Sequence, residues 1–437
     1  MTLPRSLPAL PPGPRLRPAV QRLAWAERPV GFAARCHARY GDLFTVRFGR
    51  GLTLVLASDP AVVAAVFAAG PEDVRRGQAP TRRRILGDGS VVVLDDDEHA
   101  RHRALLRPPL HGPALDAHAR TIADVAARSV ERWPAGRAVR LLDELRDVTA
   151  EVLLRVVCGL DGRDADAARD RNALRAALAE LRAASARRAP SIPLVRRRWG
   201  PGVPNRRLLA AVAGIDAVLL PLVAARRAAG GGAERPDVLS ALVAATDADG
   251  RGLSDREVRD EALTLLVTGH DPMLSALAWT FERLVRRPAV LERVRTDGAY
   301  ADAAVREVLR VRPPAWLTNA RTTARDLRVG DHVLPAGTMV TAFAYLLHRN
   351  PAAFADPAAF RPERFLGAAP SPSWIPFGGG RRRCVGEHLA LLTATTVLRT
   401  AADRVDLRPA VPGDELQREV GTVFLPADGA LVVATPR

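Results

Sequence analysis

A cysteine near the C-terminus stands in the setting best suited to metal chemistry. Cys384 follows a glycine-rich loop and precedes an apolar run, in the sequence Phe377-Gly378-Gly379-Gly380-Arg381-Arg382-Arg383-Cys384-Val385-Gly386. Glycines allow a tight turn and a close approach to a flat ligand. A helix that begins just after the sulfur would direct its N–H groups and its positive end at it, which favours the thiolate. On haem iron, a thiolate ligand favours O–O cleavage.

A second stretch with chemical potential lies in a long helix predicted from about Ser254 to Arg286. Ser254 and Glu257 form the pattern of a capping box at its start. Residues 262–281 are apolar nearly all round the helix, so we expect this part to be buried. Asp271 falls inside this run, and a buried acid is costly unless it is paired or functional.

Three further groups combine charges at helical spacing. His99 and Arg103 lie one turn apart, as do Glu307 and Arg310, and Arg364 follows in the segment Phe360-Arg361-Pro362-Glu363-Arg364-Phe365. Taken singly, such pairs are most simply solvated helix faces. Their order and spacing relative to Cys384 make a functional or structural role more plausible than it would be for any one pair.

Together these stretches resemble the cytochrome P450 family of haem-thiolate monooxygenases, in its soluble bacterial type. The family signature Phe-x-x-Gly-x-Arg-x-Cys-x-Gly is matched, and the resemblance covers the whole chain. It implies that Cys384 is the axial ligand of the iron of haem b. The other cofactor-binding residues that it implies are Phe377, Gly378, Arg382, His99, Arg103 and Arg321, the last four as propionate ligands. It also implies a buried structural triad of Glu307, Arg310 and Arg364.

The long helix resembles the family's oxygen-activation helix but departs from it at one position. The family pattern is a small residue, Gly, any residue, an acid and then Thr; here Gly269 and Asp271 match, Thr268 takes the small-residue position, and Pro272 replaces the threonine. That threonine helps deliver protons in the family, and proline cannot donate one. Proline also leaves the Thr268 carbonyl without its N–H partner, so we expect the helix to kink or open. The catalytic candidates are therefore Asp271, Thr268 and Pro272, and the missing donor could be a substrate hydroxyl, Thr268 or a water molecule.

Composition limits the partners. All 64 basic residues of the 437-residue chain are arginines, against 48 acids, which gives a formal charge of +16. A basic surface attracts acidic partners, but the sequence has no recognisable nucleic-acid module. Arg381 and Arg383 are predicted to be free to face an acidic ferredoxin. Three cysteines cannot build a disulfide framework, no signal peptide is evident, and no uninterrupted apolar stretch looks long enough to span a membrane. We expect a cytoplasmic, monomeric protein.

The predicted fold is mainly α with small β-sheets, in a single cytochrome P450-like domain over residues 1–437 with a proline-rich lead-in at 1–18. Residues 43–48 and 52–57 predict a strand pair, and residues 18–40 and 114–185 predict helices. In this fold the haem would lie between the long central helix and the cysteine loop. The expected pocket walls are residues 69–93, 187–204, 265–271, 315–317 and 422–424.

The predicted activity is a haem-dependent oxidation, such as hydroxylation, of a hydrophobic small molecule. A secondary metabolite such as a terpenoid or polyketide would suit the mostly apolar walls. O2 would be the oxidant, and electrons would come from NAD(P)H through a ferredoxin reductase and an acidic ferredoxin. Two alternatives remain open: a peroxygenase or oxidative coupling enzyme, suggested by Pro272, and a haem-thiolate protein that binds without turnover.

Overall fold

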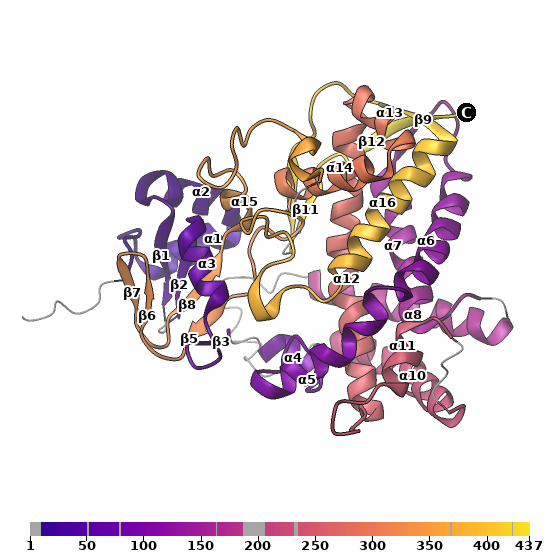
Figure 1. Ribbon diagram of the computed structural model, residues 1–437, viewed down its shortest axis with the longest axis horizontal. Helices are drawn as coiled ribbons and strands as arrows, with labels where there is room; N and C mark the ends of the chain where they lie inside the picture. Colours follow the sequence, from indigo (N-terminus) through magenta and orange to yellow (C-terminus); the bar gives the residue numbers. More distant parts are fainter. Residues whose placement is uncertain are drawn as a thin grey trace, which may run out of the picture. The chain divides into compact units, whose positions relative to one another are not determined.

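The computed structural model describes residues 10–49, 52–77, 80–162, 164–186, 206–230, 235–367, 369–421 and 423–437 (Figure 1). It is mainly helical with small sheets, as the sequence predicts. The predicted connection at 187–204, Thr422 and the first nine residues lie outside the described residues. The α-helices are α1 Pro18–Glu27, α2 Pro29–Tyr40, α3 Pro60–Ala68, α4 Pro80–Leu86, α5 Asp96–Leu106, α6 Ala114–Val130, α7 Leu141–Cys158, α8 Ala165–Ala186, α10 Arg206–Ala228, α11 Val238–Ala244, α12 Asp255–Leu284, α13 Pro288–Thr296, α14 Gly298–Val311, α15 Ala344–Leu347 and α16 Glu387–Arg404. The strands are β1 Leu43–Gly49, β2 Leu52–Ala57, β3 Val74–Arg76, β4 Ala138–Arg140, β5 Arg321–Thr323, β6 Leu327–Val329, β7 His332–Leu334, β8 Met339–Ala342, β9 Val405–Pro409, β10 Gln417–Val420, β11 Val423–Pro426 and β12 Leu431–Pro436.

The described residues fall into two compact units. The first unit takes its residues from 1–78, 309–361 and 367–384, and the second from 79–308, 362–366 and 385–437. The cysteine loop ends the first unit, whereas α5 and α12 belong to the second. The sequence predicts that the whole chain forms a single domain. This stays a prediction, because it depends on how the two units join.

The first unit is built on a five-stranded sheet with the strand order β1-β2-β8-β5-β3. The predicted strand pair is confirmed: β1 and β2 are antiparallel, with Leu43 opposite Ala57. β8 joins β2 in parallel, and a separate hairpin is formed by β6 and β7. Valine and leucine side chains from β1, β2, β6, β7, β8 and α3 form one buried cluster. This cluster gives the unit a core of its own.

The second unit is organised around α12, which packs against α7, α10 and α16 (Figure 1). Its predicted capping box is confirmed: the Glu257 N–H donates to Ser254 Oγ, and Glu257 Oε2 accepts the Ser254 N–H at 2.7 Å. Strand β11 is fixed to the other half of the helix. Trp279 Nε1 donates to the Phe424 carbonyl at 3.0 Å, and both residues are fully buried.

Three sequence expectations need correction. The helical stretch 18–40 is two helices, because Pro29 begins a new helix after Arg28. The stretch 114–185 includes the strand β4, which pairs with β12 far along the chain. No stretch was expected to be long enough to span a membrane, but α10 is long and apolar enough by composition. One such helix is weak evidence for a membrane span, and Asp216 on α10 forms an ion pair with Arg259 of α12.

Candidate functional site

The cysteine loop depends on backbone conformations that favour glycine. Gly378 and Gly380 have φ angles of 70° and 62°, in the left-handed region. The Cys384 N–H donates to the Phe377 carbonyl at 2.9 Å and closes the loop. Helix α16 begins three residues after Cys384, as the sequence predicts.

The loop also lies too close to α3 for any larger residue. A Cβ atom added to Gly379 would lie 2.1 Å from the Phe67 ring, and one added to Gly380 would lie 2.2 Å from the Phe67 carbonyl oxygen. Both glycines are therefore required by close approach, and Gly380 by its φ angle as well.

Arg321 braces the same loop from β5. Its guanidinium donates to the Gly379 carbonyl at 2.7 Å and to the Val66 carbonyl at 3.3 Å, and the side chain is buried. Burial, followed by the charges of Arg381 and Arg382, lowers the pKa of Arg321 to about 10. Arg321 thus holds the loop in shape, while its role as a propionate ligand stays a prediction.

The arginines beside Cys384 are less accessible than expected. Arg381, Arg382 and Arg383 are all half-buried. Arg381 donates to the Val74 carbonyl at 3.3 Å, so the expectation that it is free to face a redox partner is wrong. The hydrogen bond commits it to the contact between the loop and β3.

Cys384 differs from the other two cysteines in accessibility. Cys36 and Cys158 are buried, as predicted for core residues, whereas Cys384 is exposed. Burial raises the pKa of the Cys36 thiol to about 11 and that of Cys158 further. Because the thiolate is the metal-binding form, Cys36 and Cys158 are poorly suited to hold a metal, and the role of Cys384 as the haem ligand stays a prediction.

Beyond its exposed first turn, helix α12 is exposed at one further place, which coincides with the predicted oxygen-activation motif. Between Val258 and Val285 every residue is buried except five, which we call the α12 window: Val267, Thr268, Gly269, Asp271 and Pro272. The Asp271 side chain is 52% exposed. The expectation that Asp271 is buried is therefore wrong. It failed because the apolar sequence pattern around Asp271 does not show where neighbouring elements stop covering the helix.

Asp271 is held in its ionised form by its neighbours. His270 Nδ1 lies 2.8 Å from Asp271 Oδ1. Partial loss of water around the carboxylate would raise the pKa of Asp271, but the hydrogen bond from His270 and the charges of His270, Arg182 and Arg146 outweigh it and lower that pKa. His270 itself is buried, and its Nε2 has no hydrogen-bond partner in the described structure.

Thr268 and Pro272, the other two catalytic candidates in the α12 window, differ from expectation in hydrogen bonding and in helix geometry. The Thr268 hydroxyl donates to the Thr264 carbonyl at 2.7 Å, so it is already engaged within the helix. Helix α12 continues through Pro272 without a break. The predicted opening of the helix at this proline is therefore not observed.

The structure brings part of the predicted charge triad together. Glu307 is fully buried, and Arg364 Nε lies 3.6 Å from its carboxylate. Arg310 is also fully buried and donates to the carbonyls of His348, Pro357 and Ala359 at 2.9 to 3.0 Å. The triad as a unit stays a prediction, as do the propionate roles of His99, which is buried on α5, and Arg103.

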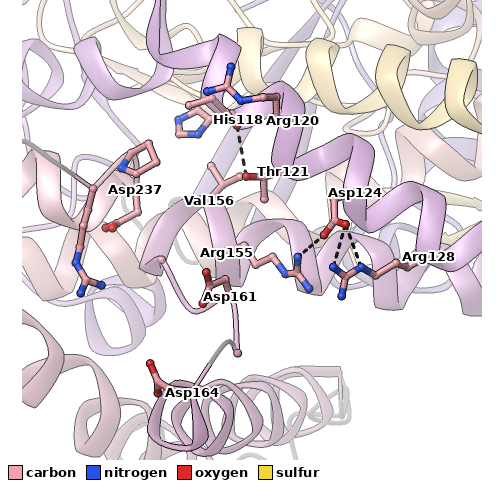
Figure 2. A pocket seen from close by; sticks show the side chains of 15 residues that line it. His118, Arg120, Thr121, Asp124, Arg128, Arg155, Val156, Asp161, Asp164 and Asp237 are labelled. Atoms are coloured by element: carbon pink, nitrogen blue, oxygen red, sulfur yellow. Dashed lines mark hydrogen bonds and ion pairs between the residues drawn. The ribbon is translucent and has the colours of Figure 1, made fainter.

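Two cavities were not expected from the sequence. The larger, about 920 Å³, is bordered by α6, α7 and the segment before α11 (Figure 2). Asp124 meets Arg128 and Arg155 there, and Asp237 lines the same cavity. The lining is charged, which does not suit an apolar substrate.

The smaller cavity, about 510 Å³, holds a group of side chains that spacing alone could not reveal. One potential metal-ligand atom from each of Glu98, His102 and Glu257 lies within 4.8 Å of the others. Arg101 Nη1 lies 3.5 Å from Glu98 and 3.7 Å from Glu257, so a cation already opposes these carboxylates. The group therefore belongs to the packing of α5 on α12.

Comparison with known proteins gives a consistent result. The family model described as Cytochrome P450 matches residues 11–415. A Mycobacterium tuberculosis (strain ATCC 25618 / H37Rv) protein that carries the name cytochrome P450 135B1 is 35% identical over 436 residues, covering 97% of this chain and 91% of its own. Cytochrome P450 138 of the same organism is 34% identical and covers 98% of each chain. The solved structure of retinoic acid bound cyanobacterial CYP120A1 has a TM-score of 0.84 at 22% identity, covering 99% of this chain and 100% of its own, and so shows the fold.

Proposed function

The chain belongs to the cytochrome P450 family, whose members are haem-dependent monooxygenases, and on that premise we propose that it hydroxylates or otherwise oxidises a hydrophobic small molecule. Bound haem supplies the site at which O2 is activated with electrons from redox partners. The mostly apolar positions of the expected pocket walls support a substrate of the terpenoid or polyketide kind.

We assign the cofactor to Cys384 as the iron ligand, in the form of haem b. Two observations support this choice: Cys384 is exposed, whereas Cys36 and Cys158 are buried, and the glycine loop before it is fixed by close contacts with Phe67. The remaining cofactor contacts in this proposal are Phe377, Gly378, Arg382, His99, Arg103 and Arg321.

The observation that carries the function is the exposed acid in the α12 window. Asp271 is ionised and half-exposed in the α12 window, whereas the other α12 residues from Val258 onward are buried. A carboxylate in this state can accept a proton from solvent and pass it inward, which is the work of a positioned acid–base group. Thr268 is a poor second donor, because its hydroxyl already donates to the Thr264 carbonyl.

The test is the coupling of product formation to NAD(P)H consumption. We expect Asp271→Asn to reduce coupling by about 100-fold or more, the lower end of typical acid–base contributions, while Thr268→Ala couples nearly as well as the wild type. Asp166→Asn, at an exposed position on α8, is the matched control. Intact coupling in Asp271→Asn would remove Asp271 from the relay.

A second candidate function follows from Pro272, which occupies the position of the family's proton-delivering threonine. A peroxygenase does not need that proton delivery, because hydrogen peroxide brings its protons with it. Turnover with hydrogen peroxide and without reductase, at a rate equal to or above the NAD(P)H-driven rate, would favour this candidate. Restoration of NAD(P)H-driven activity in Pro272→Thr would favour the monooxygenase.

For electron delivery we propose an acidic ferredoxin with its reductase, acting on a monomeric cytoplasmic enzyme. The formal charge of +16 supports an acidic partner. Arg383, next to Cys384 in the sequence, is our choice for a docking residue.

A further inference from the structure

Two imidazoles that are far apart in the sequence meet at the start of α16. The rings of His111 and His388 lie with their centroids 4.2 Å apart and their planes tilted by 57°. His388 is in the first turn of α16. His111 belongs to the connection between α5 and α6, directly after the buried residues Pro109 and Leu110. Each ring therefore stands on a firmly packed element, which suits a preformed binding site.

The ring nitrogens of this pair differ from those of other histidines in the chain. His102, His118 and His348 each have a ring nitrogen within hydrogen-bond distance of an acceptor oxygen. Among the described residues, none forms a hydrogen bond or an ion pair with His111 or His388. Neutral imidazole nitrogens are the commonest protein ligands of transition metals. The two rings thus offer lone pairs that no side chain or backbone group of the described structure uses.

The surroundings keep His111 in the neutral form that metal binding requires. Burial, followed by the charges of His388, Arg107 and Arg103, lowers the pKa of His111, while Glu387 acts in the opposite direction. The two arginines would also oppose a bound cation, but neither forms a hydrogen bond or an ion pair with the described rings. His388 is exposed and His111 is half-buried, so an ion can reach the pair from solvent.

The separation of the rings is close to that of two histidines on one metal ion. With metal–nitrogen bonds of about 2.0–2.1 Å, the ring centroids lie about 4.5 Å apart when the bonds meet at a right angle, and about 5.2 Å apart in a tetrahedral site. The observed 4.2 Å is nearer to the first value. Right-angled ligands are typical of the tetragonal geometry of Cu²⁺ and Ni²⁺, whereas Zn²⁺ prefers a tetrahedron.

We propose that His111 and His388 form a binding site for a divalent transition metal, with Cu²⁺ and Ni²⁺ bound more tightly than Zn²⁺. Water would complete the coordination, because within the described ranges no third side-chain ligand joins this pair. The metal would link the first turn of α16 to the connection before α6, the helix against which α16 packs (Figure 1). The site shares no residue with the haem contacts or the proton relay of the proposed function.

The first measurement is calorimetric titration of the untagged, haem-loaded protein with Ni²⁺, Cu²⁺ and Zn²⁺ separately. Haem-loaded protein is used because an unligated Cys384 thiolate would itself bind these metals. We expect His111→Gln and His388→Gln each to weaken Ni²⁺ binding at least about tenfold, since even the outer-shell partners of a metal site contribute about 10–100-fold in affinity. The matched control is His332→Gln, which removes a half-buried histidine of β7 that also has no hydrogen-bond partner among the described residues.

Unchanged affinity in either variant would overturn the proposal, as would an equal loss in His332→Gln. Tighter binding of Zn²⁺ than of Cu²⁺ would contradict the right-angled geometry. If His111→Gln does not fold, His388→Gln decides alone, because its side chain is exposed.

The second measurement is thermal unfolding with and without Ni²⁺. The unfolded chain does not hold the two rings together, so the metal should stabilise the folded protein. At a Ni²⁺ concentration of about 100 times Kd, the melting temperature of the wild type should rise by about 3 °C. It should not rise in the double variant His111→Gln/His388→Gln. An equal rise in both proteins would show that the metal acts elsewhere and would overturn the proposal.

Discussion

Glu261 should make the stability of the protein fall as pH rises from 5 to 8. Its side chain is fully buried, and burial raises the pKa of Glu261 from 4.5 to about 7 despite hydrogen bonds from His102 and the Val91 N–H; the neighbouring Asp260 acts in the same direction as burial. A raised pKa means that the contribution to stability is present below the unfolded pKa and is lost as pH rises through about 7. A shift of about 2.5 pH units corresponds to about 3 kcal/mol in total, of which about 2.5 kcal/mol falls between pH 5 and pH 8 by linkage.

His102 adds to this effect in the same direction. Burial would lower its pKa, but the carboxylates of Glu261 and Glu257 outweigh burial and raise it. The stabilising charge on His102 is therefore also lost at high pH. Arg101, which lies near Glu98 and Glu257, keeps its charge throughout this range.

The assay is urea unfolding at pH 5, 6, 7 and 8 for the wild type, Glu261→Gln and the exposed control Glu292→Gln. Between pH 5 and pH 8, we expect the free energy of unfolding to decrease by at least about 2 kcal/mol less in Glu261→Gln than in the wild type. The control should follow the wild type. An equal decrease in Glu261→Gln and the wild type would refute the reasoning, because it would show that Glu261 is ionised at no cost in the folded protein.

Three other predictions concern Glu307, Gly380 and Arg383. Glu307→Ala should destabilise the holoprotein by about 3–5 kcal/mol, measured by thermal unfolding, because it leaves the Arg364 guanidinium without its carboxylate; a normal melting temperature would contradict the proposed triad. Gly380→Ala should cost at least about 2 kcal/mol and lower haem content, because the new Cβ would meet the Phe67 carbonyl in a left-handed conformation; full haem content would contradict the close approach. Arg383→Gln should slow reduction by an acidic ferredoxin and flatten its dependence on ionic strength, whereas Arg169→Gln, exposed on α8, should not; equal rates in both variants would place the docking site elsewhere.

Local sequence patterns predicted those features whose cause is local. The capping box at Ser254 and Glu257 predicted the start of α12, and two short apolar runs on either side of a glycine-containing turn predicted β1 and β2. The cysteine motif could be identified because glycine conformation and the position of a helix start are short-range properties.

Features that depend on distant residues could not be predicted in this way. Asp271 was expected to be buried, because an apolar helix face does not show where packing stops. The acceptors for Gly89 and Val91 lie about 170 positions along the chain. Charged residues such as Asp260 and Glu261 also read as a solvent-facing stretch, although their hydrogen bonds bury them.

The bracing of the cysteine loop has a consequence for how the cofactor is acquired. The loop is fixed by the Arg321 bond to the Gly379 carbonyl, the Cys384 bond to the Phe377 carbonyl and the contact of Gly380 with Phe67, all of which are made by the polypeptide itself. The conformational entropy of ordering this loop is therefore lost when the first unit folds, and little of it remains to be lost when haem arrives. A weakened brace would shift that entropic cost to the capture step, so that haem affinity falls even where every residue in contact with haem is intact.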